Sequence, residues 1–218
     1  MSGFLGSTVG KKYLMGITGL IWAGFVLVHM AGNLLIFVSN DAYNAYGHAI
    51  TSGNIVYVAE VILVLALIAH VSLAINLTVN NREAKAQKYA VAAKGKKRVT
   101  LASRTMAIQG SLILVFIILH LITFKYGTVY TTNVHGTEMR DLAKLMVEVF
   151  AQPGYVVWYV ICLILLGFHL KHGVGSSFQS LGLMEGTYRE TWRKLSIAYG
   201  IIVALGFIAQ PLYIFFGR

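Results

Sequence analysis

Long apolar stretches separated by shorter polar segments dominate the pattern along this chain. Five of these stretches approach the length of about 20 residues that crosses about 30 Å of hydrocarbon. A helix satisfies its backbone hydrogen bonds within one segment, as lipid requires. The pattern therefore predicts an all-α integral membrane bundle of five transmembrane helices, with residues 1–218 forming a single domain. The apolar stretches cover residues 13–37, 54–79, 105–124, 154–170 and 195–216.

Composition excludes an ordinary soluble protein. Of the 218 residues, 57% are hydrophobic and 12% are charged, and the mean hydropathy is +0.69, whereas about a quarter of the residues of a soluble domain are charged. The first apolar stretch exceeds the apolar region of about 7 to 15 residues in a signal peptide, so we expect it to remain as a helix. Cys162 is the lone cysteine. With one cysteine, the chain cannot form a framework of internal disulfides.

Basic residues predict the orientation of the bundle. The N-terminal segment and the segments 80–104 and 171–194 hold 14 of the 18 lysines and arginines. Basic loops stay on the cytoplasmic side, which places the N-terminus in the cytoplasm and the C-terminus outside. The net charge of +10 is then mainly a topology signal, and nucleic acid is not an expected partner. The basic inner face would suit an acidic partner protein.

Four histidines lie inside four different apolar stretches: His29, His70, His120 and His169. Ionisable groups within a membrane are costly and usually functional, and imidazole is a common axial ligand of haem iron. The alternative for each histidine is a packing role, with a hydrogen bond to a neighbouring helix.

The depths of these histidines predict two pairs. At a rise of 1.5 Å per residue, His29 and His120 lie about 7 to 8 Å outside the midpoints of their spans, and His70 and His169 about 5 to 9 Å on the cytoplasmic side. We therefore expect an outer pair and an inner pair, about 12 to 17 Å apart, each ligating one b-type haem. His172 shares a helix face with His169, and we assign it to a haem propionate or a quinone rather than to iron.

At this point the chain resembles a known family. Its five spans, the histidines in the first four of them, and two short motifs are similar to the di-haem cytochrome b subunit of succinate:quinone oxidoreductases, which include succinate dehydrogenases and fumarate reductases. The resemblance covers essentially the whole chain. It implies the same histidine pairing that depth predicts. The motifs are Gly-Phe-His-Leu-Lys-His-Gly at residues 167–173 and Phe-Gln-Ser-Leu-Gly at residues 178–182.

The resemblance also implies a role in the respiratory chain and the tricarboxylic acid cycle. Members of the family anchor a flavoprotein and an iron-sulfur subunit on the cytoplasmic side of the bacterial inner membrane, and they exchange electrons with a quinone, commonly menaquinone. Dicarboxylate chemistry belongs to the flavoprotein, so this chain would be the quinone-reacting subunit of an oxidoreductase. Some fumarate reductases carry a glutamate two residues before the ligand of the fourth span. Gly167 stands at that position, so we do not expect that proton route.

Several charged residues are candidates for quinone and propionate contacts. Glu60 is the one acidic residue within a span, and an intramembrane carboxylate there could exchange a proton with the quinone; a hydrogen-bonded packing role is the alternative. A buried propionate needs a cationic partner, and the candidates equally suit an anchoring role at the membrane interface. The candidates are Lys12, Arg104 and Lys171 for the inner haem and Lys125 for the outer haem.

Two further expectations concern the outer face and the alternatives. Apolar residues recur at helical spacing from Met139 to Phe150, which predicts a short interfacial helix that caps the outer haem or simply packs on the surface. Other functions remain open: the di-haem anchor of a hydrogenase or nitrate reductase, and a transporter or channel with polar residues along its path.

Overall fold

The computed structural model describes residues 3–83, 101–184 and 186–217. Within them, five helices are long and apolar enough to cross a membrane, so the prediction of an all-α chain with five spans is confirmed. The protein is a multi-pass membrane protein. The spans cover Thr8–Phe37, Ile55–Asn81, Thr105–Lys125, Pro153–Ser180 and Gly186–Gly217.

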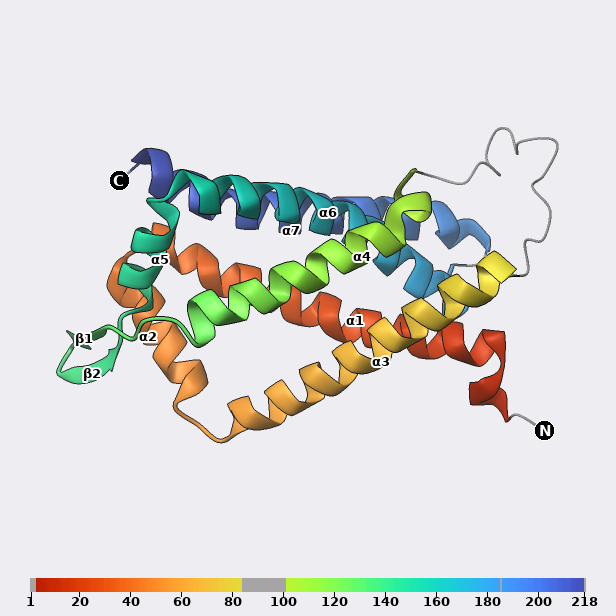
Figure 1. Ribbon diagram of the computed structural model, residues 1–218, viewed down its shortest axis with the longest axis horizontal. Coiled ribbons are helices and arrows are strands. Elements are labelled where there is room, and N and C mark those ends of the chain that lie inside the picture. Colours follow the sequence, from red (N-terminus) through yellow and green to blue (C-terminus); the bar gives the residue numbers. More distant parts are fainter. Residues whose placement is uncertain (1–2, 84–100, 185, 218) are drawn as a thin grey trace.

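The spans run alternately along the long axis of the molecule (Figure 1). The N-terminus, the end of α3, the start of α4 and the connection between α6 and α7 lie at one end, and the C-terminus lies at the other. We call the latter the outer end, following the predicted orientation. The long helices are α1 (Thr8–Asn33), α3 (Ile55–Glu83), α4 (Leu101–His120), α6 (Pro153–Ser180) and α7 (Arg189–Gly217).

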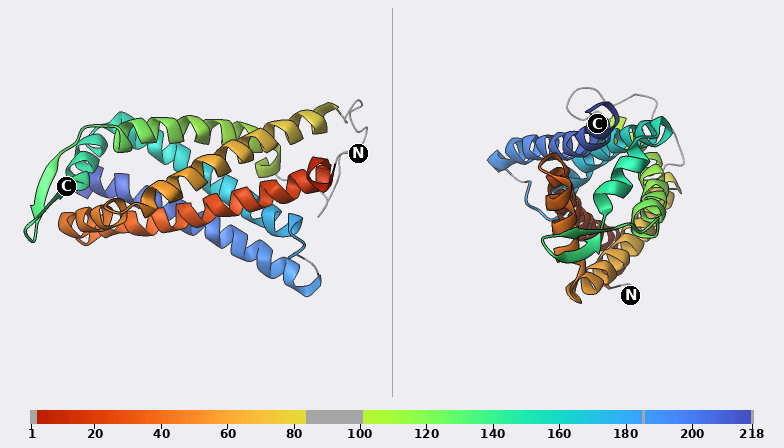
Figure 2. Two further views of the ribbon diagram at one scale, coloured as in Figure 1. Left: turned by 90° about the horizontal axis from the view of Figure 1, so that it is seen from below. Right: turned by 90° about the vertical axis from the view of Figure 1, so that its left-hand side faces the viewer.

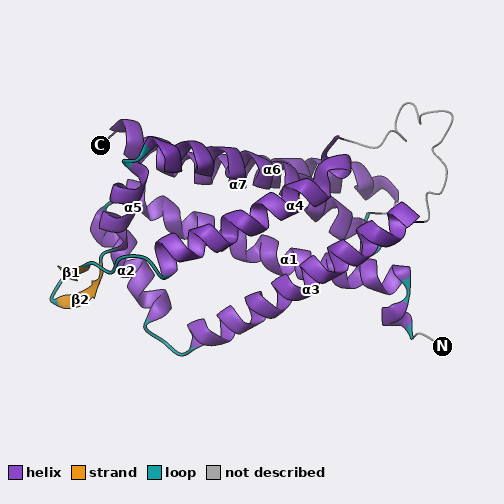
Figure 3. Ribbon diagram, viewed as in Figure 1, coloured by secondary structure: helices purple, strands orange, loops and turns teal. Residues whose placement is uncertain are grey.

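Short elements gather at the outer end, where Figures 2 and 3 show α2, α5 and the hairpin beside the C-terminus. Four short helical turns complete the described chain. The strands pair antiparallel, with Thr131 opposite Arg140 and Val134 opposite Thr137. The outer elements are α2 (Asn40–Thr51), β1 (Thr131–Val134), β2 (Thr137–Arg140) and α5 (Leu142–Phe150); the turns are η1 (Phe4–Gly6), η2 (Leu34–Phe37) and η5 (Gly186–Tyr188), and η4 (Leu121–Lys125) is one π-helical turn that extends α4.

Side-chain caps begin the outer helices. The hydroxyl of Ser39 accepts a hydrogen bond of 3.0 Å from Ala42 N, which satisfies a free amide in the first turn of α2. The carboxylate of Asp141 does the same for α5, accepting from Lys144 N at 3.0 Å. Asn44, only 1% exposed, links the two helices because it donates to Asp141 Oδ1 and accepts from Ala143 N.

Close packing of small residues joins α6 to α7. A Cβ atom added to Gly200 would lie 2.6 Å from the carbonyl oxygen of Gly167, so the two backbones meet directly. Nearby, Val203 is fully buried, and the hydroxyl of Tyr199 donates to the carbonyl of Ala23 on α1. Small residues allow this close approach of membrane helices. Helix α7, which carries no histidine, therefore supports α1 and α6.

Helices α3 and α4 are the least enclosed spans. Only 6% of the residues in the most apolar window of each are buried, compared with 28% in α6 and α7. α3 packs mainly on α1, and α4 packs mainly on α6. The seam between α3 and α4 is therefore the most open side of the described bundle.

Three expectations about local structure are wrong. Residues 171–180, predicted as loop, continue α6, because Val174 and Ser177 stay buried against other helices. Helix α7 begins at Arg189, six residues before the predicted span. The short helix before α6 is present as α5, but Met139 belongs to strand β2 instead. Which end of the bundle faces the cytoplasm stays a prediction.

Candidate functional site

The outer pair of histidines meets between α1 and α4. The ring centroids of His29 and His120 lie 5.9 Å apart, with their planes at 86°. Phenylalanines from three helices surround them, so the pair sits in an aromatic, water-poor environment. Phe25 stacks on His29 and Phe207 lies 5.7 Å from it; Phe116 stacks on His120 and Phe124 lies 5.2 Å from it.

The two outer imidazoles differ in how closely hydrogen-bonding groups approach their ring nitrogens. Nδ1 of His120 lies 3.1 Å from the hydroxyl of Tyr159, a buried residue of α6. Asn33 approaches the His29 ring nitrogens only at 3.5 Å, while its amide donates to the His29 carbonyl at 2.7 Å. Tyr43 of α2 donates in turn to Asn33 Oδ1 at 2.9 Å. Burial raises the pKa of Tyr43 to about 12, so its hydroxyl stays protonated and remains a donor.

The inner pair lies among α1, α3, α4 and α6. His70 Nδ1 is 3.1 Å from the hydroxyl oxygen of Thr18 on α1. His169 lies on α6, one turn before His172. Its Nδ1 is buried and has no hydrogen-bond partner among the described residues, which is costly for a polar atom unless a ligand occupies the site.

Glycines leave space beside both inner imidazoles. A Cβ atom on Gly19 of α1 would stand 3.3 Å from Cε1 of His70, and one on Gly110 of α4 would stand 3.6 Å from Cε1 of His169.

The residues that contact the inner histidines also give the distance between the inner and outer pairs along each helix. His29 follows Thr18 by eleven residues on α1, and His120 follows Gly110 by ten on α4. At a rise of 1.5 Å per residue, the two intervals give about 15 to 17 Å between the two levels.

The outer pair has a spacing that suits one metal ion between two imidazoles. Metal bonds to imidazole nitrogen are about 2 Å long, so two rings on opposite faces of one ion have centroids about 6 Å apart. Among the described residues, no three of His, Cys, Asp and Glu cluster as a metal site. Haem iron takes two axial ligands from the protein, so His29 and His120 would be sufficient to hold one such ion.

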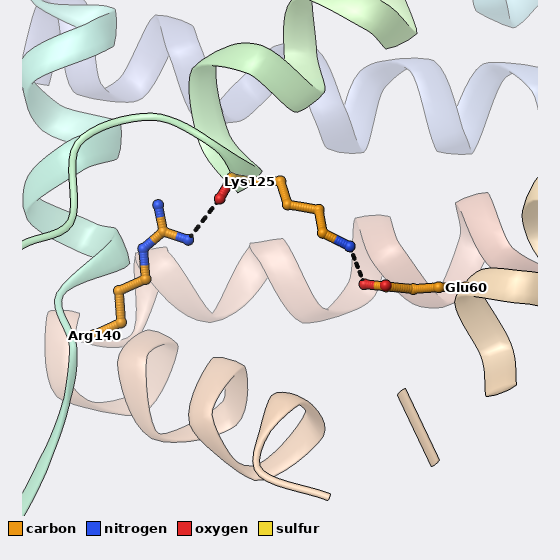
Figure 4. A network of polar contacts seen from close by, with 3 residues as sticks. All are labelled: Glu60, Lys125 and Arg140. Atoms are coloured by element: carbon orange, nitrogen blue, oxygen red, sulfur yellow. Dashed lines mark hydrogen bonds and ion pairs between the residues drawn. The ribbon is translucent and has the colours of Figure 1, made fainter. Parts of the chain in front are cut away.

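The charged candidates occupy different surroundings. Glu60 of α3 and Lys125 form an ion pair across the seam between α3 and α4 (Figure 4). Their side chains are 40% and 37% exposed. Arg140 donates to the carbonyls of Phe124 and Lys125, which satisfies the free carbonyls where this span ends. The ammonium group expected near an outer propionate is therefore engaged by Glu60.

The remaining candidates lie towards the inner end. Lys12 and Lys171 are exposed, and His172 is half-buried one turn beyond His169. Arg104 belongs to α4, but its side chain lies outside the described residues.

Sequence reasoning missed Thr18 and Tyr159, the hydroxyl partners of two histidines. Spacing could have found them: Thr18 lies eleven residues before His29, and Tyr159 lies ten residues before His169. Each is therefore at the level of the other histidine pair.

Comparisons with protein-family models, curated proteins and solved structures found no match for this chain. What the chain does has to be inferred from its own residues.

Proposed function

We propose that this chain is the di-haem cytochrome b anchor of a succinate dehydrogenase or quinol:fumarate reductase complex. The observation that carries the proposal is the meeting of the His29 and His120 rings from two alternate spans, with centroids 5.9 Å apart; His70 and His169 are the second predicted pair. His29 and His120 would ligate the outer haem b, and His70 and His169 the inner one. When bound, haem supplies one-electron redox chemistry; the protein supplies axial ligands, a dry setting and a fixed separation.

A separation of about 15 Å between the two levels supports a role in carrying electrons across the membrane. The inner end would receive the iron-sulfur subunit and, with it, the flavoprotein that carries out dicarboxylate chemistry. Exposed basic side chains at that end support an acidic partner, among them Lys12, Arg189 and Lys194. A menaquinone-type quinone would react near the outer end, in the bacterial cytoplasmic membrane.

Glu60 is the proposed proton-exchanging group for the quinone. It lies at the outer end of α3, ten residues before His70, and at the open seam with α4. Lys125 forms an ion pair with its carboxylate. A proton taken up from quinol would neutralise the carboxylate and release Lys125, so proton uptake would break this ion pair.

The test is haem quantification on the purified full chain, expressed with ample haem, together with four histidine-to-alanine variants. We expect two haems per chain. His29→Ala and His120→Ala should each abolish the spectrum of one haem, and His70→Ala and His169→Ala that of the other. His48→Ala, a histidine of α2 outside the spans, is the control and should keep both. A colourless chain would favour a transporter, and a single haem would contradict the pairing.

Partner capture separates the complexes that share this architecture. Purification of the tagged chain from membranes should bring down a flavoprotein with covalent flavin and succinate dehydrogenase activity. Recovery of a hydrogenase or nitrate reductase catalytic subunit instead would refute the succinate assignment while leaving the two haems intact.

A further inference from the structure

Two hydroxyl groups contact the histidines in a crossed arrangement. Thr18 belongs to α1, whose own histidine is in the outer pair, yet it contacts His70 of the inner pair. Tyr159 belongs to α6, whose own histidine is in the inner pair, yet it contacts His120 of the outer pair. Each pair thus has one imidazole fixed by a hydroxyl from a third helix.

The surroundings of Thr18 decide which atom donates. Its hydroxyl oxygen lies 2.9 Å from the carbonyl of Leu14 and 3.1 Å from that of Met15. Carbonyl oxygens only accept, so the single hydroxyl proton points along α1. The oxygen must then accept from the Nδ1–H of His70.

A proton on Nδ1 leaves Nε2 with a free lone pair. A neutral imidazole has one donor and one acceptor nitrogen, and the hydrogen bond made by one nitrogen sets which nitrogen binds a metal. His70 is therefore prepared to ligate through Nε2. The hydroxyl of Tyr159 lies 3.1 Å from Nδ1 of His120, and by accepting from Nδ1–H it would give His120 the same tautomer.

We propose that Thr18 and Tyr159 are positioning residues that fix His70 and His120 as Nδ1–H tautomers, with Nε2 directed to iron. This inference rests on the proposed function. Such outer partners orient a ligating histidine and raise its basicity. A more basic ligand stabilises ferric iron, so each hydroxyl lowers the midpoint potential of its own haem.

The test is a redox titration of the haem-loaded full chain with Thr18→Val and Tyr159→Phe. Thr18→Val should raise the potential of the haem lost in His70→Ala, and Tyr159→Phe that of the haem lost in His120→Ala. Haem affinity at the Tyr159→Phe site should fall by about 10-fold or more.

Matched controls separate positioning from general packing. Thr18→Ser keeps the hydroxyl and should restore the wild-type potential. Thr123→Val removes a hydroxyl that bonds its own helix at Leu119, and Tyr155→Phe removes one a single turn from Tyr159; neither should move either potential. Unchanged potentials in Thr18→Val and Tyr159→Phe, or a shift of the wrong haem, would overturn the inference while two bound haems uphold the proposed function.

A measurement on the unsubstituted chain covers variants that fail to fold. Nitrogen-15 NMR of the full chain before haem is added reports the tautomer of each histidine, and His70→Gln and His120→Gln identify the signals. Protons on Nδ1 support the inference. Protons on Nε2 overturn it.

Discussion

Replacement of Gly200 by alanine tests the packing of α6 on α7. The new Cβ would lie 2.6 Å from Gly167 O, 2.9 Å from Lys171 N and 3.0 Å from Lys171 Cβ. Two of these three atoms belong to the backbone, so no side-chain rotation relieves the contact. Restoring an ordinary separation of 3.4 Å requires the helices to move apart by about 0.8 Å. Overpacking of this kind costs about 1 to 3 kcal/mol.

The control for this variant is Gly173→Ala. Gly173 also lies in α6, and nothing stands within 4 Å of the added Cβ, so alanine there should gain up to about 1 kcal/mol of helix propensity. Unfolding of both variants by titration with a denaturing detergent, followed by circular dichroism, compares their free energies of unfolding. We expect Gly200→Ala to be the less stable by at least about 1 kcal/mol. Equal stability would refute the direct backbone contact.

Two further predictions concern the outer end. Asn44→Ala removes a buried amide, which leaves Ala143 N and Asp141 Oδ1 without their hydrogen bonds to it, and should cost about 1 to 3 kcal/mol. The loss should appear as faster hydrogen exchange in α5. Exposed Asn54→Ala is the control, and unchanged exchange would contradict the link between α2 and α5. The pKa of Tyr130 is raised because its hydroxyl donates to Glu148 at 2.7 Å and the carboxylate opposes the phenolate. This contact stabilises the fold below the ordinary tyrosine pKa of 10.0 and is lost as pH rises through the raised value. Glu148→Gln should therefore shift one tyrosine to lower pH in an ultraviolet titration, absent in Tyr130→Phe; superimposable curves would count against it.

The spans were predictable because lipid imposes a strong length and composition requirement on a helix. The ends of the helices were not predictable from hydropathy. Helix α6 continues past Leu170 because its residues pack against other helices, although they are less apolar. Helix α2 escaped prediction since its buried Asn44 has its partner Asp141 far along the chain. Helical rise predicted the levels of the histidines, but not the rotation of each helix. Whether His29 and His120 face each other therefore required the structure.

The open seam between α3 and α4 has a consequence for biogenesis. Each histidine pair takes one member from α1 or α3 and the other from α4 or α6, so each ligated iron would bridge the two halves of the bundle. A flat macrocycle can enter sideways from the bilayer if α3 and α4 part, while the tight contact of α6 with α7 stays closed. Bound haem would then hold the two halves of the bundle together. We expect proteases and labelling reagents to reach α3 and α4 more readily before haem binds than after it.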